Sequence, residues 1–187
     1  LYKARNLAIK KRKGKFISFL DVDDWWEKNK LNKQVNFFSK NPVIDVLYSN
    51  VYLYSEKKKK KQIFVKKKLN YGKITQKLID RNELRILSVI LKKNIFNKIK
   101  FDDRYTIIGD LDFFVRLSLI KDIGVIQEPL ANYRVHSSNL SKKRIDLNIK
   151  ELENWVSEKT KNKAFSLVNF SKIYKLIKIL KIHNNFI

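Results

Sequence analysis

Apolar positions along the chain alternate between a helical period and short buried runs. Helices are predicted where apolar residues recur every three or four positions, and strands where a short apolar run lies between turn signals. The predicted helices span 2–13, 25–39, 72–81, 110–120 and most of the chain after 141. The predicted strands span 16–20, 46–54, 62–66, 86–92, 123–126 and 129–136. This alternation predicts an α/β domain over residues 1–144 and a basic helical C-terminal tail over residues 145–187.

Two helices carry additional local signals. Asp24 and Glu27 have the spacing of a capping box, which predicts that a helix begins at Trp25. In a later helix, Asp112 and Arg116 are four residues apart, so we expect their side chains to pair.

The composition narrows the class of protein. Apolar residues make up 44% of the 187 positions and aromatic residues 12%, which is enough to build a packed core. Cysteine is absent, so disulfides, thiolate metal sites and cysteine nucleophiles are excluded. The sequence shows neither an apolar run of membrane-span length nor a signal peptide. Methionine is absent even at position 1, so we expect a piece of a longer reading frame or a processed form.

The net charge of +24 has two interpretations. One is a polyanionic partner, either nucleic acid or an anionic membrane. The other is a genome rich in A and T, which raises the lysine content of any tolerant surface, and lysine supplies 34 of the 42 basic residues. We favour the second, and expect the charge to act through solubility and attraction to anionic surfaces. The lysine run 57–61 is then a solvated loop tip.

The strongest chemical signal is a cluster of three carboxylates, Asp21, Asp23 and Asp24, directly after the predicted strand 16–20. Ligands bind at the carboxyl ends of strands in open α/β sheets. Asp21 and Asp23 are two residues apart, so in extended backbone they face the same side and repel unless a cation lies between them. Oxygen ligands of this kind suit Mg²⁺ or Mn²⁺. Asp24 taken alone is more simply a helix cap.

Two further signals lie later in the chain. Asn132, Arg134 and His136 share one face of the predicted strand 129–136. Arginine pairs with phosphate and a neutral imidazole binds divalent metals, although a single strand histidine is more often structural. Asp110 lies at or near a helix start, where it is either a cap or a general base at the rim of a site.

Taken together, these segments resemble family 2 glycosyltransferases. The matching segments are Ala4-Arg5-Asn6, residues 14–26 with their Phe-Leu-Asp-Val-Asp-Asp sequence, residues 108–117, and residues 133–141, which read Tyr-Arg-Val-His-Ser-Ser-Asn-Leu-Ser. Motifs in this order over residues 4–141 are specific, whereas any one of them alone is not.

The resemblance implies a GT-A fold, in which a Rossmann-like mixed sheet is flanked by helices. It implies transfer of a sugar, with inversion, from a nucleotide-sugar donor to the hydroxyl of a glycan, lipid-linked or other acceptor. Such an enzyme would act in cell-surface polysaccharide or glycan synthesis, in the cytoplasm or peripherally at the inner face of the membrane. No nucleic acid partner is expected.

The resemblance also assigns roles to individual residues. Asp21 and Asp23 match the D-x-D motif and, together with His136, would hold Mn²⁺ or Mg²⁺. Asp110 would deprotonate the acceptor hydroxyl. The residues assigned to the donor are Arg5, Asn6, Asp21, Asp24 and Arg134.

The chain departs from the family pattern in two ways. Many members have Glu-Asp where this chain has Gly109-Asp110. The family also begins with a strand-and-loop region that grips the nucleobase, and the chain lacks these first nucleotide-binding strands. We therefore expect an N-terminally truncated enzyme that binds donor poorly and is inactive on its own.

Two other functions compete with this interpretation. A phosphatase of the haloacid-dehalogenase type also carries D-x-D after a buried strand, with Asp21 as nucleophile and Asp23 as acid. That family requires Thr or Val at the position of Trp25, and a second aspartate at the position of Phe114. A basic nucleic-acid-binding module is the non-enzymatic alternative, but zinc-finger spacing and RNP-type motifs are absent and arginines are few.

The last predicted helix, near residues 171–182, is amphipathic. Lysines recur every three residues and leave an apolar face composed of Ile173, Leu176, Ile177 and Leu180. This pattern suits a helix lying on an anionic membrane surface, and suits equally a helix packed on its own domain with lysines outward.

Overall fold

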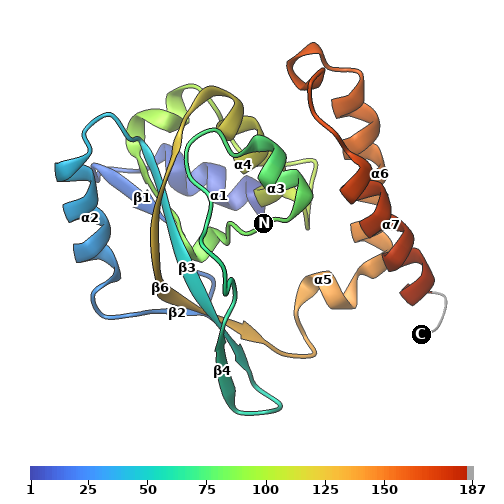
Figure 1. The fold of residues 1–187 in the computed structure, drawn as a ribbon, viewed down its shortest axis with the longest axis horizontal. Helices are drawn as coiled ribbons and strands as arrows, with labels where there is room; N and C mark the ends of the chain where they lie inside the picture. The colour runs from blue at the N-terminus through green and yellow to red at the C-terminus, as the bar shows by residue number, and fades with distance from the viewer. Residues whose placement is uncertain (185–187) are drawn as a thin grey trace.

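The structure, a computed structural model, describes residues 1–184 and contains a mixed sheet with helices on both faces (Figure 1). The strands follow the order β1-β5-β3-β6-β2, and β4 pairs with β3 off this path. The strands are β1 Phe16–Ser18, β2 Trp25–Trp26, β3 Val46–Ser55, β4 Lys60–Ile63, β5 Ile90–Lys92 and β6 Ile123–Val135. The helices are α1 Tyr2–Lys10, α2 Lys30–Lys40, α3 Thr75–Asp80, α4 Gly109–Ile120, α5 Leu140–Lys143, α6 Ile145–Thr160 and α7 Ser171–Asn184, with 3-10 turns η1 Ile86–Ser88, η2 Lys93–Asn97 and η3 Lys163–Phe165.

The centre of the sheet is the parallel pair β3 and β6. Their register runs from Val46 opposite Ile123 to Ser55 opposite Val135, with irregularities on either side of Asn50. Two separate strands were predicted over 123–136, and this prediction is wrong. The chain stays extended through 127–128 because β3 is long enough to pair with both halves of β6. The register between β3 and β6 shifts on either side of Asn50, which accommodates the extra residues of β6 at this point.

The two faces of the sheet bury different sets of side chains because successive strand residues point to opposite sides. On β3, Val46 and Tyr48 enter the main core with α1, α4 and the tail helices, whereas Leu47 packs with Phe38 of α2 on the other face. Figure 1 shows α2 on one side of the sheet and α1 and α4 on the other.

The predicted helix start at Trp25 is wrong. Trp25 and Trp26 instead form β2, which pairs antiparallel with Asn132 and Ala131 at the end of β6. Aromatic residues favour the half-buried surface of a sheet edge, and this pairing is available only through tertiary contact. Helix α2 begins five residues later, at Lys30.

Other predicted helices and strands differ from the structure in where they begin and end. Helix α3 covers only part of 72–81, because Gly72 adopts a positive φ of 80° and bridges to Ile123. The predicted strand 86–92 divides into η1 and β5. The hairpin of β3 and β4 confirms the turn at the lysine run, although β4 begins at Lys60 rather than at residue 62.

The chain after residue 141 is helical, as predicted, and only residues 185–187 of that prediction lie outside the described residues. Helices α6 and α7 pack side by side (Figure 1), and Trp155 of α6 is fully buried against Phe170. Ile173 and Ile177 of α7 join the same core cluster as Phe113 of α4. Among the helices of residues 1–184, none combines the length and apolar character needed to cross a membrane.

Candidate functional site

A cleft of about 1000 Å³ lies at the end of the sheet where β1 and β6 finish. The loop over 19–24 crosses this end of the sheet, because β1 lies at one edge and β2 at the other. The cleft brings together residues predicted from distant motifs: Arg5, Asp21, Asp23, Asp24 and Asp110 all line it. The connection after α3 and helix α7 also line the cleft.

Asp23 and His136 face each other in this region. The Asp23 Oδ2 and His136 Nε2 atoms are 2.9 Å apart. Asn139 orients the histidine, since its Oδ1 accepts the backbone N–H of His136 at 2.8 Å. The backbone N–H of Ser138 donates to His136 Nδ1 at 3.1 Å, so the ring proton belongs on Nε2, directed at Asp23.

Asp21 is paired with Arg5 of α1. Arg5 Nη2 donates to Asp21 Oδ1 at 2.6 Å, and the guanidinium lies 5.3 Å from the Tyr2 ring centroid. Asn6, which was predicted to contact donor, has its side-chain amide engaged elsewhere. It donates to the Phe101 carbonyl at 2.8 Å and accepts from the Phe101 N–H at 3.1 Å. Its observed contacts therefore fix α1 to the loop before α4.

Asp24 does not cap a helix, contrary to the prediction. Its Oδ1 accepts the backbone N–H of Arg134 at 2.8 Å, while Arg134 Nε donates to the Asp23 carbonyl at 2.9 Å. Burial, together with the negative charges of Asp23 and Asp21, raises the pKa of Asp24 to about 6, although the Arg134 N–H acts in the opposite direction. These bonds attach the carboxylate loop to the end of β6.

Asp110 is the second residue of α4, and its Oδ1 accepts the backbone N–H of Leu111 at 2.8 Å. Burial raises the pKa of Asp110 above the ordinary aspartate value. The Leu111 N–H and the positive charges of Arg85 and Arg5 act in the opposite direction and favour the ionised carboxylate.

Glu151 of α6 holds the backbone that leads into Asp110. Its two carboxylate oxygens accept the N–H groups of Thr106, Ile107 and Ile108 at 2.7, 2.9 and 3.1 Å. A carboxylate at this position also complements the positive end of the α4 dipole. The tail helix therefore fixes the start of α4, and with it the position of Asp110.

Gly109 fits this region because Tyr2 occupies the space beside it. A Cβ built on Gly109 would collide with the Tyr2 ring, and the Tyr2 hydroxyl donates to the Ile107 carbonyl at 3.1 Å. The close approach of α1 to α4 accounts physically for glycine at this position.

Asp112 has a structural environment. It is fully buried, and its carboxylate accepts from Arg116 Nε at 2.7 Å, which confirms the predicted pair. Trp155 Nε1 donates to Asp112 at 3.0 Å and Lys159 Nζ lies 2.9 Å away, so the same carboxylate binds α6 to α4.

Two residues of the site were not singled out from the sequence. Arg85 lines the cleft and influences Asp110, and Glu151 supports the loop before it. For Arg85 the only local signal was a charged residue between two apolar neighbours, Leu84 and Ile86, and Glu151, next to Lys150, gave no such signal. Such residues are buried only when something compensates their charge, but the sequence does not identify the partner.

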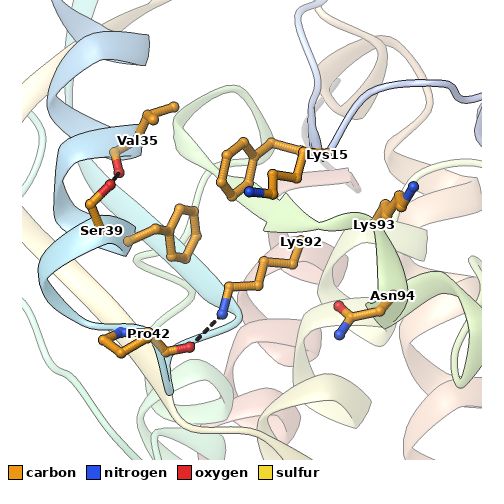
Figure 2. A pocket seen from close by; sticks show the side chains of 9 residues that line it. Lys15, Val35, Ser39, Pro42, Lys92, Lys93 and Asn94 are labelled. Carbon is orange, nitrogen blue, oxygen red and sulfur yellow. Dashed lines mark hydrogen bonds between the residues drawn. The ribbon is translucent and has the colours of Figure 1, made fainter.

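A second hollow, of about 400 Å³, lies between α2 and β5, and none of the predicted site residues lines it. Phe16 and Phe38 stack there with ring centroids 5.1 Å apart. Figure 2 shows Lys92 reaching the Pro42 carbonyl across this hollow, a contact of 2.6 Å. The lysine is thus engaged in holding β5 to the end of α2.

Within residues 1–184, no three His, Cys, Asp or Glu side chains form a cluster that could hold a metal ion. Of the three residues predicted to hold a metal, Asp23 and His136 are in direct contact, whereas Asp21 pairs with Arg5. Adjacent ligands of an octahedral Mg²⁺ are about 3 Å apart, because each lies about 2.1 Å from the ion. The observed 2.9 Å fits two such ligands, with water or a diphosphate supplying the others.

Comparison with known proteins places this site in context. The chain is 29% identical over 133 residues to an uncharacterized glycosyltransferase of Methanocaldococcus jannaschii, covering 71% of this chain and 46% of that protein. It is 30% identical over 122 residues to the Escherichia coli UDP-Glc:alpha-D-GlcNAc-diphosphoundecaprenol beta-1,3-glucosyltransferase WfgD, covering 65% of this chain and 45% of that protein. The chain thus spans about half the length of the curated relatives it matches.

The fold is also found in a solved structure. The crystal structure of Staphylococcus aureus TarS 1-349 superposes with a TM-score of 0.62 at 16% identity, covering 94% of this chain and 48% of that one. This likeness concerns the fold alone, and it confirms the predicted GT-A-like α/β architecture. The family model described as Glycosyl transferase family 2 matches residues 1–105, more than half of the chain. The chain therefore belongs to glycosyl transferase family 2.

Proposed function

We propose that the protein carrying this chain transfers a sugar from a nucleotide-sugar donor to an acceptor hydroxyl, with inversion at the anomeric carbon. One observation carries the proposal: Asp110 lines the same cleft as Asp21 and Asp23. An inverting displacement needs a base for the incoming hydroxyl on one face of the sugar and charge stabilisation of the departing diphosphate on the other. The cleft offers both kinds of group.

On the donor side, we assign contacts to Arg5, Asp21, Asp24 and Arg134. Arg5 neutralises Asp21 in the present arrangement, and the Arg134 guanidinium lies over Trp25 at 5.3 Å with part of its surface exposed. Asn6 contributes by fixing α1, on which Arg5 is mounted. Asp24 contributes by attaching the carboxylate loop to β6.

Asp23 and His136 are the residues that would hold Mn²⁺ or Mg²⁺. Their facing atoms have the spacing of adjacent ligands, and Asp21 is the nearby carboxylate of the same loop. His136 would bind through Nε2, which requires the ring proton to move to Nδ1 and the Ser138 N–H to release that nitrogen. A bound divalent cation would offset negative charge on the departing nucleoside diphosphate.

On the acceptor side, Asp110 is the proposed general base. The Leu111 N–H, Arg85 and Arg5 favour its ionised form, the state that accepts a proton from the acceptor hydroxyl. The phosphatase alternative would need Asp21 as the nucleophile, whereas Arg5 engages that carboxylate directly.

The acceptor class is proposed from the relatives. The name of WfgD specifies a UDP-glucose donor and a diphosphoundecaprenol-linked sugar as acceptor. We extend to this protein the general form of that reaction, with a glycan or lipid-linked sugar as acceptor. The corresponding setting is polysaccharide synthesis, peripherally at the cytoplasmic face of the membrane.

The test uses the intact protein with a panel of nucleotide sugars, a lipid-linked sugar acceptor and Mn²⁺. We expect acceptor-dependent release of a nucleoside diphosphate, with the anomeric configuration of the product opposite to that of the donor by NMR. Retention of configuration would contradict the proposed displacement. Hydrolysis of a phosphate monoester, without transfer from any nucleotide sugar, would favour the phosphatase instead.

A further inference from the structure

The connection between α3 and η1 contributes a second polar group of residues to the cleft. Arg81, Asn82 and Arg85 all line it. None of them belongs to a motif that carries the family resemblance. What they could bind rests on the proposed function, because the group lies beside the proposed base Asp110.

Arg85 has no polar partner of its own in the part of the chain that the structure describes. Its Nε is buried without a hydrogen-bond partner, and no carboxylate of residues 1–184 lies within ion-pair distance of its guanidinium. The guanidinium lies 4.5 Å from the Phe64 ring centroid and 6.0 Å from that of Tyr133. The guanidinium is half-buried and has no bonded anion among these residues, so an anionic ligand would complete its interactions.

Asn82 and Arg81, in the same connection, add a hydrogen-bond acceptor and a second positive charge near Arg85. Asn82 Oδ1 is also buried without a hydrogen-bond partner among residues 1–184, so it can accept a hydrogen bond from a ligand hydroxyl. Arg81 adds a second positive charge next to Arg85. Its own contact with Glu83 is long, at 3.8 Å, and its side chain is 58% exposed. Two arginines at one point can neutralise a diphosphate better than a single phosphate.

Helices α5 and α7 add exposed leucines to the lining of the cleft, beside Lys172 of α7. Leu140, Leu176 and Leu180 line the cleft, and Leu140 and Leu176 are 45% and 41% exposed. Helix α3 is joined to the segment before α7 by paired hydrogen bonds between Gln76 and Asn169, each 2.9 Å. A cationic group and exposed leucines in one cleft are complementary to a ligand with a diphosphate head and a hydrocarbon chain.

We propose that Arg85, assisted by Arg81, binds the diphosphate of a lipid-diphosphate-linked acceptor, whose hydrocarbon chain lies along Leu140 and Leu176. Asn82 then accepts a hydrogen bond from a hydroxyl of the acceptor sugar. This arrangement brings the acceptor sugar to the side of the cleft where Asp110 lies.

The experiment is a calorimetric titration of the intact protein with farnesyl diphosphate, in the presence of UDP and Mn²⁺. We expect Arg85→Gln to weaken binding by at least about tenfold, and farnesol to bind much more weakly than farnesyl diphosphate. Arg104→Gln is the matched control, because Arg104 pairs with Asp102 and Glu158 outside the cleft and its loss should leave the affinity unchanged.

Three results would overturn the proposal. They are an unchanged affinity of Arg85→Gln for farnesyl diphosphate, equal affinities of the unaltered protein for farnesol and farnesyl diphosphate, and a loss of UDP affinity in Arg85→Gln instead of a loss of farnesyl diphosphate affinity. The last result would assign the phosphate to the donor. Arg85→Lys is the second variant, which keeps the charge but loses the planar fork, and we expect an intermediate affinity. The titration involves no turnover, so a failure of this subsite and a failure of sugar transfer are separate results.

Discussion

The Nε2 atom of His136 lies 2.9 Å from the Oδ2 atom of Asp23, although 113 positions separate the two residues in the sequence. The contact exists because the loop after β1 crosses the end of the sheet to reach β6. Arg134 reinforces it by donating to the carbonyl of Asp23. Two of the motifs that carry the resemblance, residues 14–26 and 133–141, are thus joined by direct bonds.

The first prediction concerns this pair. We expect Asp23→Ala and His136→Ala each to weaken Mn²⁺ binding in a calorimetric titration of the intact enzyme with donor nucleotide present. The reason is that each variant removes one of the two facing residues that we propose as metal ligands. Asn139→Ala serves as the intermediate case, because it removes only the residue that orients His136. Mn²⁺ affinity unchanged in both alanine variants would contradict the metal assignment.

The parts of the fold that follow from local pattern could be predicted from the sequence, and the parts that follow from distant pairing could not. Helix α4 was predicted because its apolar face and the pair Asp112 and Arg116 lie within a few turns. Strand β2 was missed because Trp25 and Trp26 become extended only by pairing with β6. Capping propensity at Asp24 was a weak local preference, which this tertiary pairing overrides.

The same distinction applies to the site. The carboxylates after β1 could be located from the strand that precedes them. Glu151 could not, because its role depends on the docking of α6 against the loop before α4, some 44 residues earlier in the chain. Arg85 could not be located either, because only the folded structure shows that its Nε is buried without a hydrogen-bond partner in the described part of the chain.

A second prediction concerns the pH dependence of stability. Lys30 is fully buried under Trp26, and burial lowers the pKa of its ammonium group from 10.5 to about 7. Between these values the unfolded chain binds more protons than the folded one, so stability rises with pH across the window. One pKa unit corresponds to about 1.4 kcal/mol, so the free energy of unfolding can rise by up to about 5 kcal/mol between pH 7 and pH 10.5.

Urea unfolding at several pH values tests this prediction. Lys30→Met should remove most of the rise in the free energy of unfolding between neutral pH and pH 10, because it deletes the titrating group. Lys28→Met, at an exposed position of the same segment, is the control and should keep the slope. An equal slope in Lys30→Met and the unaltered protein would mean that Lys30 does not titrate in this range.

A third prediction concerns α7. The structure buries Ile173 and Ile177 against the domain but leaves Leu176, Ile179 and Ile182 about half exposed beside the lysines. We propose that this remaining strip binds an anionic membrane surface, and expect the intact protein to sediment with anionic vesicles at low salt. Replacing Lys175 and Lys178 by Gln should weaken this binding.

The matched control for α7 replaces Lys57 and Lys58 by Gln in the β3–β4 turn, which lowers the net charge equally at another place. If binding depends on net charge alone, both double variants will sediment alike, and α7 is then not the contact surface. Equal sedimentation with anionic and neutral vesicles would reject membrane binding by charge altogether.

The fourth prediction separates Asp110 from Asp112. Asp110→Asn preserves size but removes basicity, so turnover should fall by at least about 10²-fold while donor affinity stays within a few-fold. Because burial raises the pKa of Asp110, the acidic limb of the kcat profile should lie above the ordinary carboxyl value of 3.8 and disappear in the variant. Stopped assays of nucleoside diphosphate release across pH, with donor titrations alongside, provide both measurements.

Asp112→Asn is the informative comparison because the two acids lie on the same helix in different environments. Asp112 is fully buried among Arg116, Trp155 and Lys159, so its loss leaves two cations without their anion. Breaking a buried ion pair typically costs about 3–5 kcal/mol, and this cost should appear in the free energy of unfolding. Folded Asp112→Asn protein should still turn over, because Asp112 makes no contact with the cleft. If folded Asp112→Asn lost turnover and Asp110→Asn retained it, the base would be Asp112 and the roles of the two carboxylates would be exchanged.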